Sequence, residues 1–452
     1  MVGPVRHVPC QAGGIGRPFA RSLRYSTGEV DGSFLHSAIL PDVFVWIVTL
    51  ASILCMLLRP RGIPEAYWVC GGAALLLLAG LEPSGHALRA AWEGRDVYLF
   101  LAGMMVLAEL ARVEHVFDWA AGAAATHAEG SPRRLFLLVY LVGIVVTACL
   151  SNDATAVVLT PAVLAVVRRA RVRPRPYLLA CALIANAASF LLPISNPANL
   201  VLFDGQLPPL TPWLQIFLLP SVAAILVTYA CLLWLTRSDL RGGMEGEAEP
   251  APLTSEGKLA LWALVGAAVL LVACSAWDIP LGAPTCGAAF LAMAVAAWRT
   301  PRLGPRVIRG VSWAVLPLVA GLFVLVDALH SAGMTQFGLA GLQLLAGAPA
   351  WAAKLGSAFS VALLSNVMNN LPAGLMSGMA LRHAHQTGLL AHAVLIGVDL
   401  GPNLSVTGSL ATILWLIALR REKVELSAWE FLKVGAVAMP LAMLAGLLVL
   451  WN

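Results

Sequence analysis

The residues best placed to do chemistry are two short polar runs set inside long apolar stretches. These runs are Ser151-Asn152-Asp153 with Thr155, and Ser365-Asn366 with Asn369 and Asn370. Amide and hydroxyl side chains of this kind cap the free N–H groups at a helix start, and the same groups can bind a ligand. Capping alone is one interpretation. An acid at membrane depth costs about 2.5–3.5 kcal/mol on insertion scales, however, so Asp153 favours a functional role.

Each polar run is followed by an apolar stretch that proline or glycine interrupts in its middle. The polar residues of the first stretch are Asn186, Ser195, Asn196 and Asn199, and those of the second are Asp399, Asn403, Ser405 and Thr407. Proline removes a backbone donor and glycine relaxes the backbone, so both stretches should unwind and expose amides and carbonyls. Two polar tips facing two unwound stretches predict one central polar cavity.

The same landmarks occur twice in the chain. Leu150-Ser151-Asn152 returns as Leu364-Ser365-Asn366, 214 residues later. Cys70-Gly71 and Ala102-Gly103 return 216 and 218 residues later, as Cys286-Gly287 and Ala320-Gly321. Duplicated halves with helix-breaking sequence at matching depths are typical of secondary transporters, whose binding site lies at the repeat interface.

Composition places the chain in a membrane. Hydrophobic residues make up 59% of the 452 residues, charged residues only 12%, and the mean hydropathy is +0.82. We expect an all-α polytopic membrane protein with two inverted repeats, each with about five transmembrane helices, a re-entrant hairpin and a broken helix. The sequence has no phosphate-binding loop, zinc-protease motif or nucleophile elbow, and no cysteine spacing of a metal site. It predicts no enzyme, no cofactor and no nucleic-acid partner.

The expected organisation has four parts. They are a disordered basic N-terminal tail (1–40), a first transporter repeat (41–236), a cytoplasmic linker (237–257) and a second repeat (258–452). The hairpins are expected at 133–169 and 351–384, each preceded by a short amphipathic segment in the membrane interface. With ten crossings, twenty Lys and Arg residues lie in cytoplasmic segments against four outside, apart from the tail and Lys433. Twelve crossings fit this rule less well but remain open, and so does the side of the N-terminus.

Four of these segments carry a resemblance to a known family. LSNDATAVVLTP, NAASFLLPISNPANLVLF, LLSNVMNNLP and GVDLGPNLSVTGSLATILWLIALRR resemble the arsenite and antimonite exporters of the ArsB family, within the wider ion-transporter superfamily. The resemblance runs from about residue 41 to the end of the chain. It implies proton-driven export of trivalent arsenic and antimony hydroxides across the inner membrane, sometimes with a cytoplasmic ATPase subunit as partner.

The polar residues are compatible with such a substrate. Arsenous acid is neutral and rich in hydroxyls, so the amides and hydroxyls above supply matching donors and acceptors. Asp153 and Asp399 are the expected proton carriers, although Asp399 could merely cap the broken helix. Cys149 is a weaker candidate for an arsenic contact, because tight thiolate bonding would oppose release. The alternative is a sodium-coupled anion or dicarboxylate carrier of the same superfamily.

Acids and histidines outside the two polar regions are expected to be structural. Glu109 and Asp327 correspond across the repeat and lie near helix ends. Arg382-His383-Ala384-His385 has no further ligands nearby in the sequence and is expected to be an exposed hairpin base rather than a metal site.

Overall fold

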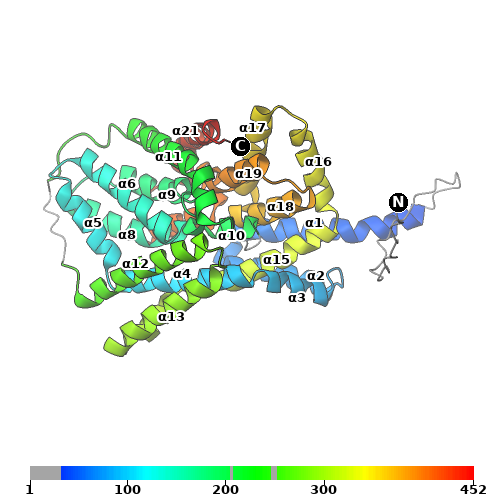
Figure 1. The fold of residues 1–452 in the computed structure, drawn as a ribbon, viewed down its shortest axis with the longest axis horizontal. Coiled ribbons are helices and arrows are strands. Elements are labelled where there is room, and N and C mark those ends of the chain that lie inside the picture. The colour runs from blue at the N-terminus through cyan, green and yellow to red at the C-terminus, as the bar shows by residue number, and fades with distance from the viewer. Residues whose placement is uncertain (1–31, 204–206, 246–251, 452) are drawn as a thin grey trace, which may run out of the picture. The chain divides into compact units, whose positions relative to one another are not determined.

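The computed structural model describes residues 32–203, 207–245 and 252–451, and every regular element in these ranges is a helix (Figure 1). The chain separates into two compact units, Met1–Leu40 and Pro41–Asn452. Helix α1 (Gly32–Leu58) begins before residue 41, so helix extends into the segment that sequence analysis assigned to a disordered tail. The rest of that segment lies outside the described residues.

The two halves of the chain contain the same elements in the same order. The first half continues with α2 (Glu65–Leu78), α3 (Ser84–Glu93), α4 (Arg95–Val113), α5 (Val116–His127), α6 (Pro132–Cys149), α7 (Asn152–Ala154), a π-helical turn (Thr155–Leu159), α8 (Thr160–Arg169), α9 (Arg175–Ala187), a 3-10 turn (Pro193–Ser195), α10 (Pro197–Leu202) and α11 (Leu210–Leu235). The second half has α12 (Ser255–Ala276), α13 (Gly282–Arg299), α14 (Leu303–Gly310), α15 (Val315–Ser331), α16 (Met334–Ala346), α17 (Ala350–Met368), α18 (Asn370–His383), α19 (Leu389–Leu400), two 3-10 turns (Gly401–Asn403 and Val406–Gly408), α20 (Leu410–Arg421) and α21 (Ala428–Leu448).

This order matches the expected repeat of spans, hairpin and broken helix, with one addition in each half. The short helices α3 and α14 were not predicted from the sequence. Six described helices are long and apolar enough to cross a membrane, and α2 and the α19 region are shorter apolar segments. The chain is therefore a polytopic membrane protein built from two inverted repeats.

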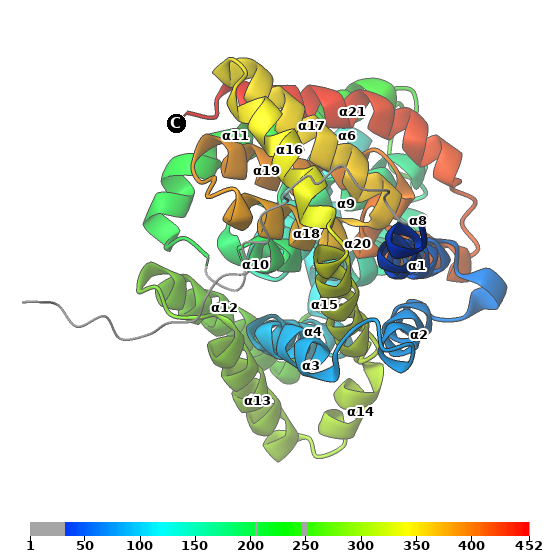
Figure 2. The same ribbon diagram turned by 90° about the vertical axis from the view of Figure 1, so that its right-hand side faces the viewer.

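The repeats pack on each other reciprocally. Helix α2 packs against α15 while α13 packs against α4, and α3 and α14 lie against α15 and α4 respectively. Figure 2 shows α2, α3, α4, α13 and α14 together in the lower part of the view. The hairpins and broken helices lie above them.

Repeated glycines allow these close crossings. A Cβ atom added at Gly103 would lie 2.7 Å from the backbone of Thr285, and one added at Gly321 would lie 2.9 Å from the side chain of Val69. The duplicated Ala-Gly and Cys-Gly landmarks of the sequence therefore meet at the two inter-repeat crossings, where a side chain would separate the helices.

Contacts along these helices fix their relative directions. Asp96, at the start of α4, accepts a 2.9 Å hydrogen bond from the backbone N–H of Gly282 at the start of α13, so the two helices run parallel. Glu82, just beyond the end of α2, lies close to Asp327 near the end of α15, so these two helices are also parallel. Since α2 and α4 cross in opposite directions, α4 and its equivalent α15 are antiparallel, as inverted repeats require.

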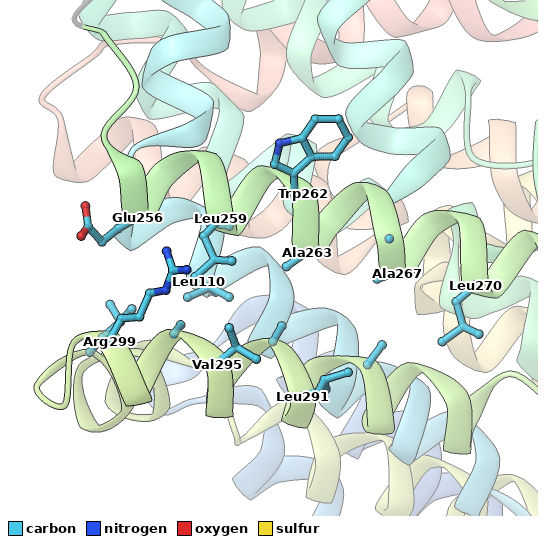
Figure 3. Close-up of a pocket in the computed structure, with 16 residues that line it drawn as sticks. Leu110, Glu256, Leu259, Trp262, Ala263, Ala267, Leu270, Leu291, Val295 and Arg299 are labelled. Carbon is cyan, nitrogen blue, oxygen red and sulfur yellow. The ribbon is translucent and has the colours of Figure 1, made fainter.

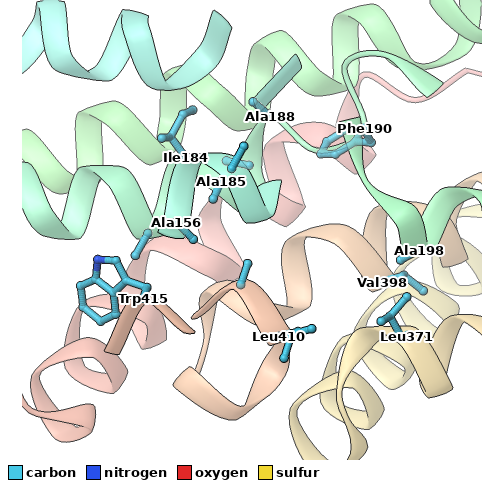
Figure 4. Packing of buried hydrophobic residues seen from close by; sticks show 14 of the residues in the cluster. Ala156, Ile184, Ala185, Ala188, Phe190, Ala198, Leu371, Val398, Leu410 and Trp415 are labelled. Atoms are coloured by element: carbon cyan, nitrogen blue, oxygen red, sulfur yellow. The ribbon is translucent and has the colours of Figure 1, made fainter. Parts of the chain in front are cut away.

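The hairpins connect the repeats in the second layer. The first arms, α6 and α17, pack on the broken helices of their own repeats, α9 and α19. The second arms cross over, because α18 packs on α10 and the π-helical turn with α8 packs on α20. Figure 4 shows the apolar side chains of this seam, among them Ala156 and Trp415 on one side and Ala198 and Leu371 on the other. The indole N–H of Trp415 also donates to the carbonyl of Leu178 across the repeats, at 3.1 Å.

Candidate functional site

The first hairpin breaks at the expected position. Helix α6 ends at Cys149, and Ser151 is extended, with its hydroxyl accepting a hydrogen bond from the backbone N–H of Ala154 at 3.2 Å. The side chain of Asn152 accepts from the N–H of Asp153 at 2.9 Å. The tip is thus a helix start capped by its own side chains, and capping is one role that these residues fill.

The residues after this tip form a turn of π-helix, Thr155–Leu159. The hydroxyls of Thr147 and Thr155 are 2.8 Å apart, joining the two arms of the hairpin just below the tip. Single π-helical turns occur frequently at functional sites, because the extra residue widens the helix and leaves backbone groups in unusual positions. Thr147 was missed by the sequence analysis, since an isolated threonine in an apolar helix gives no local signal.

The second hairpin breaks later than the first. Helix α17 continues through Ser365 and Asn366 to Met368, and the chain turns at Asn369, whose φ of 79° lies in the region that favours glycine or asparagine. Asn369 then caps α18 by accepting from the N–H of Leu371 at 3.3 Å. Ser365 and Asn366 therefore occupy the last turn of a helix, whereas their counterparts Ser151 and Asn152 form the tip itself.

Asn366 connects this last turn to the unwound part of the second broken helix. Its amide N–H₂ donates to the carbonyl of Gly401 at 2.8 Å, and its amide oxygen accepts from the N–H and the hydroxyl of Ser405 at 3.0 and 2.6 Å. The hydroxyl of Thr407 donates to the backbone carbonyl of Asn366 at 2.9 Å. These three side chains are half-buried, so the network lies at an accessible edge of the polar region.

The first broken helix is held to its own hairpin in a similar way. The hydroxyl of Ser195 donates to the carbonyl of Ala148 at 3.1 Å, near the end of α6. The side chain of Asn199 donates to the carbonyl of Ser189 at 3.0 Å. Both side chains are fully buried and satisfy backbone carbonyls that the break in the helix would otherwise leave unpaired.

Three hydrogen bonds cross between the repeats at the breaks. The side chain of Asn186 donates to the amide oxygen of Asn403 at 3.0 Å, and Asn403 in turn donates to the carbonyl of Leu183 at 3.0 Å. The side chain of Asn196 donates to one carboxylate oxygen of Asp399 at 2.6 Å. The structure thereby brings four predicted site residues from both repeats into direct contact.

Asp399 is the most unusual of these residues. Its side chain is fully buried, and its second carboxylate oxygen has no hydrogen-bond partner among the described residues. Asp153 is half-buried in the first hairpin. Neither acid forms an ion pair in the part of the chain that the structure describes.

The remaining predicted residues form no cross-repeat hydrogen bond among the described residues. Ser365 and Asn370 are buried, and the Ser365 hydroxyl has no partner in the described ranges. Cys149 is a half-buried free cysteine at the end of α6. No hydrogen bond within the described residues joins the two hairpin tips, and only the second arm of each hairpin packs against the broken helix of the opposite repeat.

The cap of α20 was also not predicted from the sequence. Ser409 and Thr412 form a reciprocal capping box, with Ser409 accepting from the N–H of Thr412 at 3.2 Å. A serine followed three residues later by a polar side chain before an apolar run is the sequence pattern of such a cap, so this element could have been found.

An apolar groove elsewhere has a different character. It lies between α12 and α13, has a volume of about 430 Å³, and is lined by side chains such as Leu259, Trp262 and Leu291, with Glu256 and Arg299 at one end (Figure 3). It contains none of the predicted site residues. An apolar lining of this kind fits lipid chains better than a hydrophilic solute.

Comparison with known proteins identifies the family of this chain. The family model described as a citrate transporter (CitMHS) matches residues 39–398. The chain belongs to this citrate transporter family. It is accordingly a multi-pass membrane transporter and not an enzyme.

Curated relatives of this family member carry a more specific name. This chain is similar to the arsenical pump membrane protein of Escherichia coli, with 27% identity over 402 residues that cover 85% of this chain and 93% of the relative. It is also similar to the arsenical pump membrane protein of Yersinia enterocolitica, with 28% identity covering 84% and 91% of the two chains. These relatives confirm the resemblance to arsenical exporters. Among solved structures, the Alcanivorax borkumensis YdaH transporter matches with a TM-score of 0.49 and 14% identity, over 80% of this chain and 86% of the other.

Proposed function

We propose that this transporter exports arsenite and antimonite as their neutral hydroxides, coupled to proton entry, by alternating access between its two inverted repeats. The observation that carries the proposal is the cross-repeat pair of Asn196 and Asp399, set among amides and hydroxyls at the two helix breaks. The similarity to arsenical pump membrane proteins supports an arsenical substrate.

The chemistry of the centre suits a neutral, hydroxyl-rich solute. Asparagine side chains offer donors and acceptors together, and serine and threonine hydroxyls can serve as either. None of the predicted site residues is basic, so nothing there would compensate the charge of an anion. Asn186, Asn403 and Asn366 already hold backbone and side-chain partners, and a substrate would have to exchange hydrogen bonds with them.

Asp399 is the leading candidate for the proton carrier. A carboxylate buried at a helix break, with one amide partner and no cation, can become neutral by taking a proton. Protonation would also change the Asn196 contact, because the carboxylic acid can donate as well as accept. Since Asn196 and Asp399 belong to opposite repeats, proton loading would act directly on the interface that alternating access must rearrange.

The topology that accompanies this proposal has ten crossings and two re-entrant hairpins. Its repeats span residues 41–236 and 258–452, with 237–257 as a cytoplasmic linker. The distribution of Lys and Arg supports this orientation, with the hairpin base at Arg168 and Arg169 inside. Cysteine labelling at position 89 from outside intact cells tests it, and exclusive labelling from the cytoplasm would contradict it.

A second candidate is a sodium-coupled organic anion carrier, which the description of the family as citrate transporters favours. Against it, two acids lie in the polar region without a cationic partner among the described residues, and they would repel a carboxylate substrate.

Everted membrane vesicles separate these possibilities. Arsenite uptake that depends on an imposed pH gradient and is abolished by a protonophore is the expected result. Uptake that ignores the pH gradient and follows sodium, or citrate uptake without arsenite uptake, would contradict the proposal. Proteoliposomes containing the purified chain alone additionally test whether an ATPase partner is needed, because proton-driven flux there requires none.

A further inference from the structure

A second group of ionisable side chains lies away from the helix breaks, where the turn between α2 and α3 meets α15 (Figure 1). The metal-ligating atoms of Glu82, His86 and Asp327 all lie within 4.8 Å of one another. Glu82 is only 1% exposed, and neither of its carboxylate oxygens has a hydrogen-bond partner among the described residues. Asp327 is half-buried, and His86 is exposed in the first turn of α3.

The charge at this place is not balanced by the protein. Two carboxylates approach each other beside a single imidazole, and neither forms an ion pair with Lys or Arg in the described ranges. An unpartnered carboxylate this deeply buried is costly unless a proton or a cation compensates it.

In the other repeat, an arginine of the same helix neutralises the equivalent acidic side chain. Glu109 occupies in α4 the place that Asp327 occupies in α15. Its carboxylate receives two hydrogen bonds from the guanidinium of Arg112, at 2.7 and 2.5 Å. The residue three positions after Asp327 is His330, so no arginine occupies this position in the second repeat.

We propose that Glu82, His86 and Asp327 bind a divalent transition-metal ion such as Zn²⁺, which fastens the α2–α3 turn of the first repeat to α15 of the second. One imidazole and two carboxylates form a donor set that zinc accepts, and the imidazole disfavours Mg²⁺ and Ca²⁺. Three protein ligands leave room for water to complete the shell.

Only small side-chain movements are needed to form the site. Ligands about 2.1 Å from a tetrahedral zinc ion lie roughly 3.4 Å from one another. The present separations are at most 4.8 Å, and the His86 side chain can rotate because it is exposed on a surface helix. The buried Glu82 would serve as the fixed ligand and His86 as the one that closes on the ion.

Isothermal titration of Zn²⁺ into the purified, metal-free full-length protein at pH 7.5 tests the proposal. We expect one Zn²⁺ per chain, no comparable binding of Mg²⁺, and weakening at lower pH because protons compete for the ligands. His86→Ala and Glu82→Gln should each weaken binding by about tenfold or more, since even loss of an outer-shell partner costs 10–100-fold.

His115→Ala is the matched control, because His115 is another exposed histidine, 2.7 Å from the carboxylate of Asp118. It should bind Zn²⁺ like the natural protein. Zn²⁺ should also raise the midpoint of thermal unfolding of the natural and control proteins, and not of His86→Ala.

Three results would overturn the inference. They are no Zn²⁺ binding by the natural protein, unchanged binding by His86→Ala, or equal weakening by His115→Ala. The first would indicate that Glu82 and Asp327 share a proton instead of holding a metal. If Glu82→Gln fails to fold, the exposed His86 position still decides the question.

Discussion

Replacing Asp399 with asparagine removes the charge of the side chain and nearly preserves its shape. The substitution keeps an oxygen that can accept from Asn196, so the 2.6 Å contact across the repeats can survive. A hydrogen bond to a charged group contributes about 1.5–3 kcal/mol, part of which is lost. Removing a charge at membrane depth relieves about 2.5–3.5 kcal/mol on insertion scales. These terms offset, so the free energy of unfolding should change by no more than about 1 kcal/mol.

Transport should respond very differently from stability. An asparagine side chain at position 399 cannot carry a proton, so pH-driven arsenite uptake into everted vesicles should fall roughly 100-fold, equivalent to about 2.7 kcal/mol in the barrier. Thermal unfolding in detergent, followed by tryptophan fluorescence, should shift by no more than about 2–4 °C. The matched control is Asp118→Asn, which removes an exposed carboxylate that pairs with His115 outside the breaks and should leave both quantities unchanged.

Two outcomes would refute this reasoning. If Asp399→Asn vesicles accumulate arsenite at the natural rate, and a protonophore still abolishes that uptake, then the proton travels by another group. If uptake is lost together with a large drop in the unfolding midpoint, Asp399 is mainly a structural cap of the broken helix, which was the alternative interpretation of its position.

Three further substitutions test other parts of the account. Asp153→Asn should abolish coupled export while folded protein remains in the membrane, and full arsenite resistance in a sensitive host would end its assignment as a proton carrier. Asn403→Ala removes two hydrogen bonds of 3.0 Å and should raise the half-saturating arsenite concentration about tenfold or more, and an unchanged concentration dependence would count against a binding role. Gly103→Val should lower the unfolding free energy by about 1–3 kcal/mol, because its Cβ would lie 2.7 Å from the Thr285 backbone. Its control, Gly71→Ala, places a Cβ where nothing lies within 4 Å and should have little effect on the unfolding midpoint.

Some of the site could be predicted because its signals are local. Asn196 and Asp399 were identified from their position beside proline and glycine in apolar stretches, and both lie at breaks in the structure. The contact between them could not be predicted, because it joins residues 203 positions apart through the packing of two repeats. Ser365 and Asn366 show the limit of the repeat argument. Their duplicated sequence suggested a second tip, yet the apolar Val367 and Met368 continue the helix to Asn369.

The repeated landmarks Gly103 and Gly321 show a further limit. Their duplication was evident, and it suggested transport machinery in general. In the structure, these glycines allow α4 and α15 to pack closely against helices of the opposite repeat. Glu109 and Asp327 were rightly paired as equivalents, but their partners differ: Glu109 contacts Arg112, whereas Asp327 faces Glu82 and His86. Equivalent positions of the two repeats therefore have different neighbouring side chains.

The amino-acid sequence by itself determined that this chain spans a membrane, that it is duplicated, and where its helices break. These properties depend on hydropathy, on proline and glycine, and on internal similarity, all of which act over a few neighbouring residues or appear by direct comparison of segments. Tertiary structure alone decided which polar side chains meet and which acids remain without a partner. Those outcomes depend on how antiparallel repeats interlock, and packing between distant helices leaves no pattern in the sequence around any one of them.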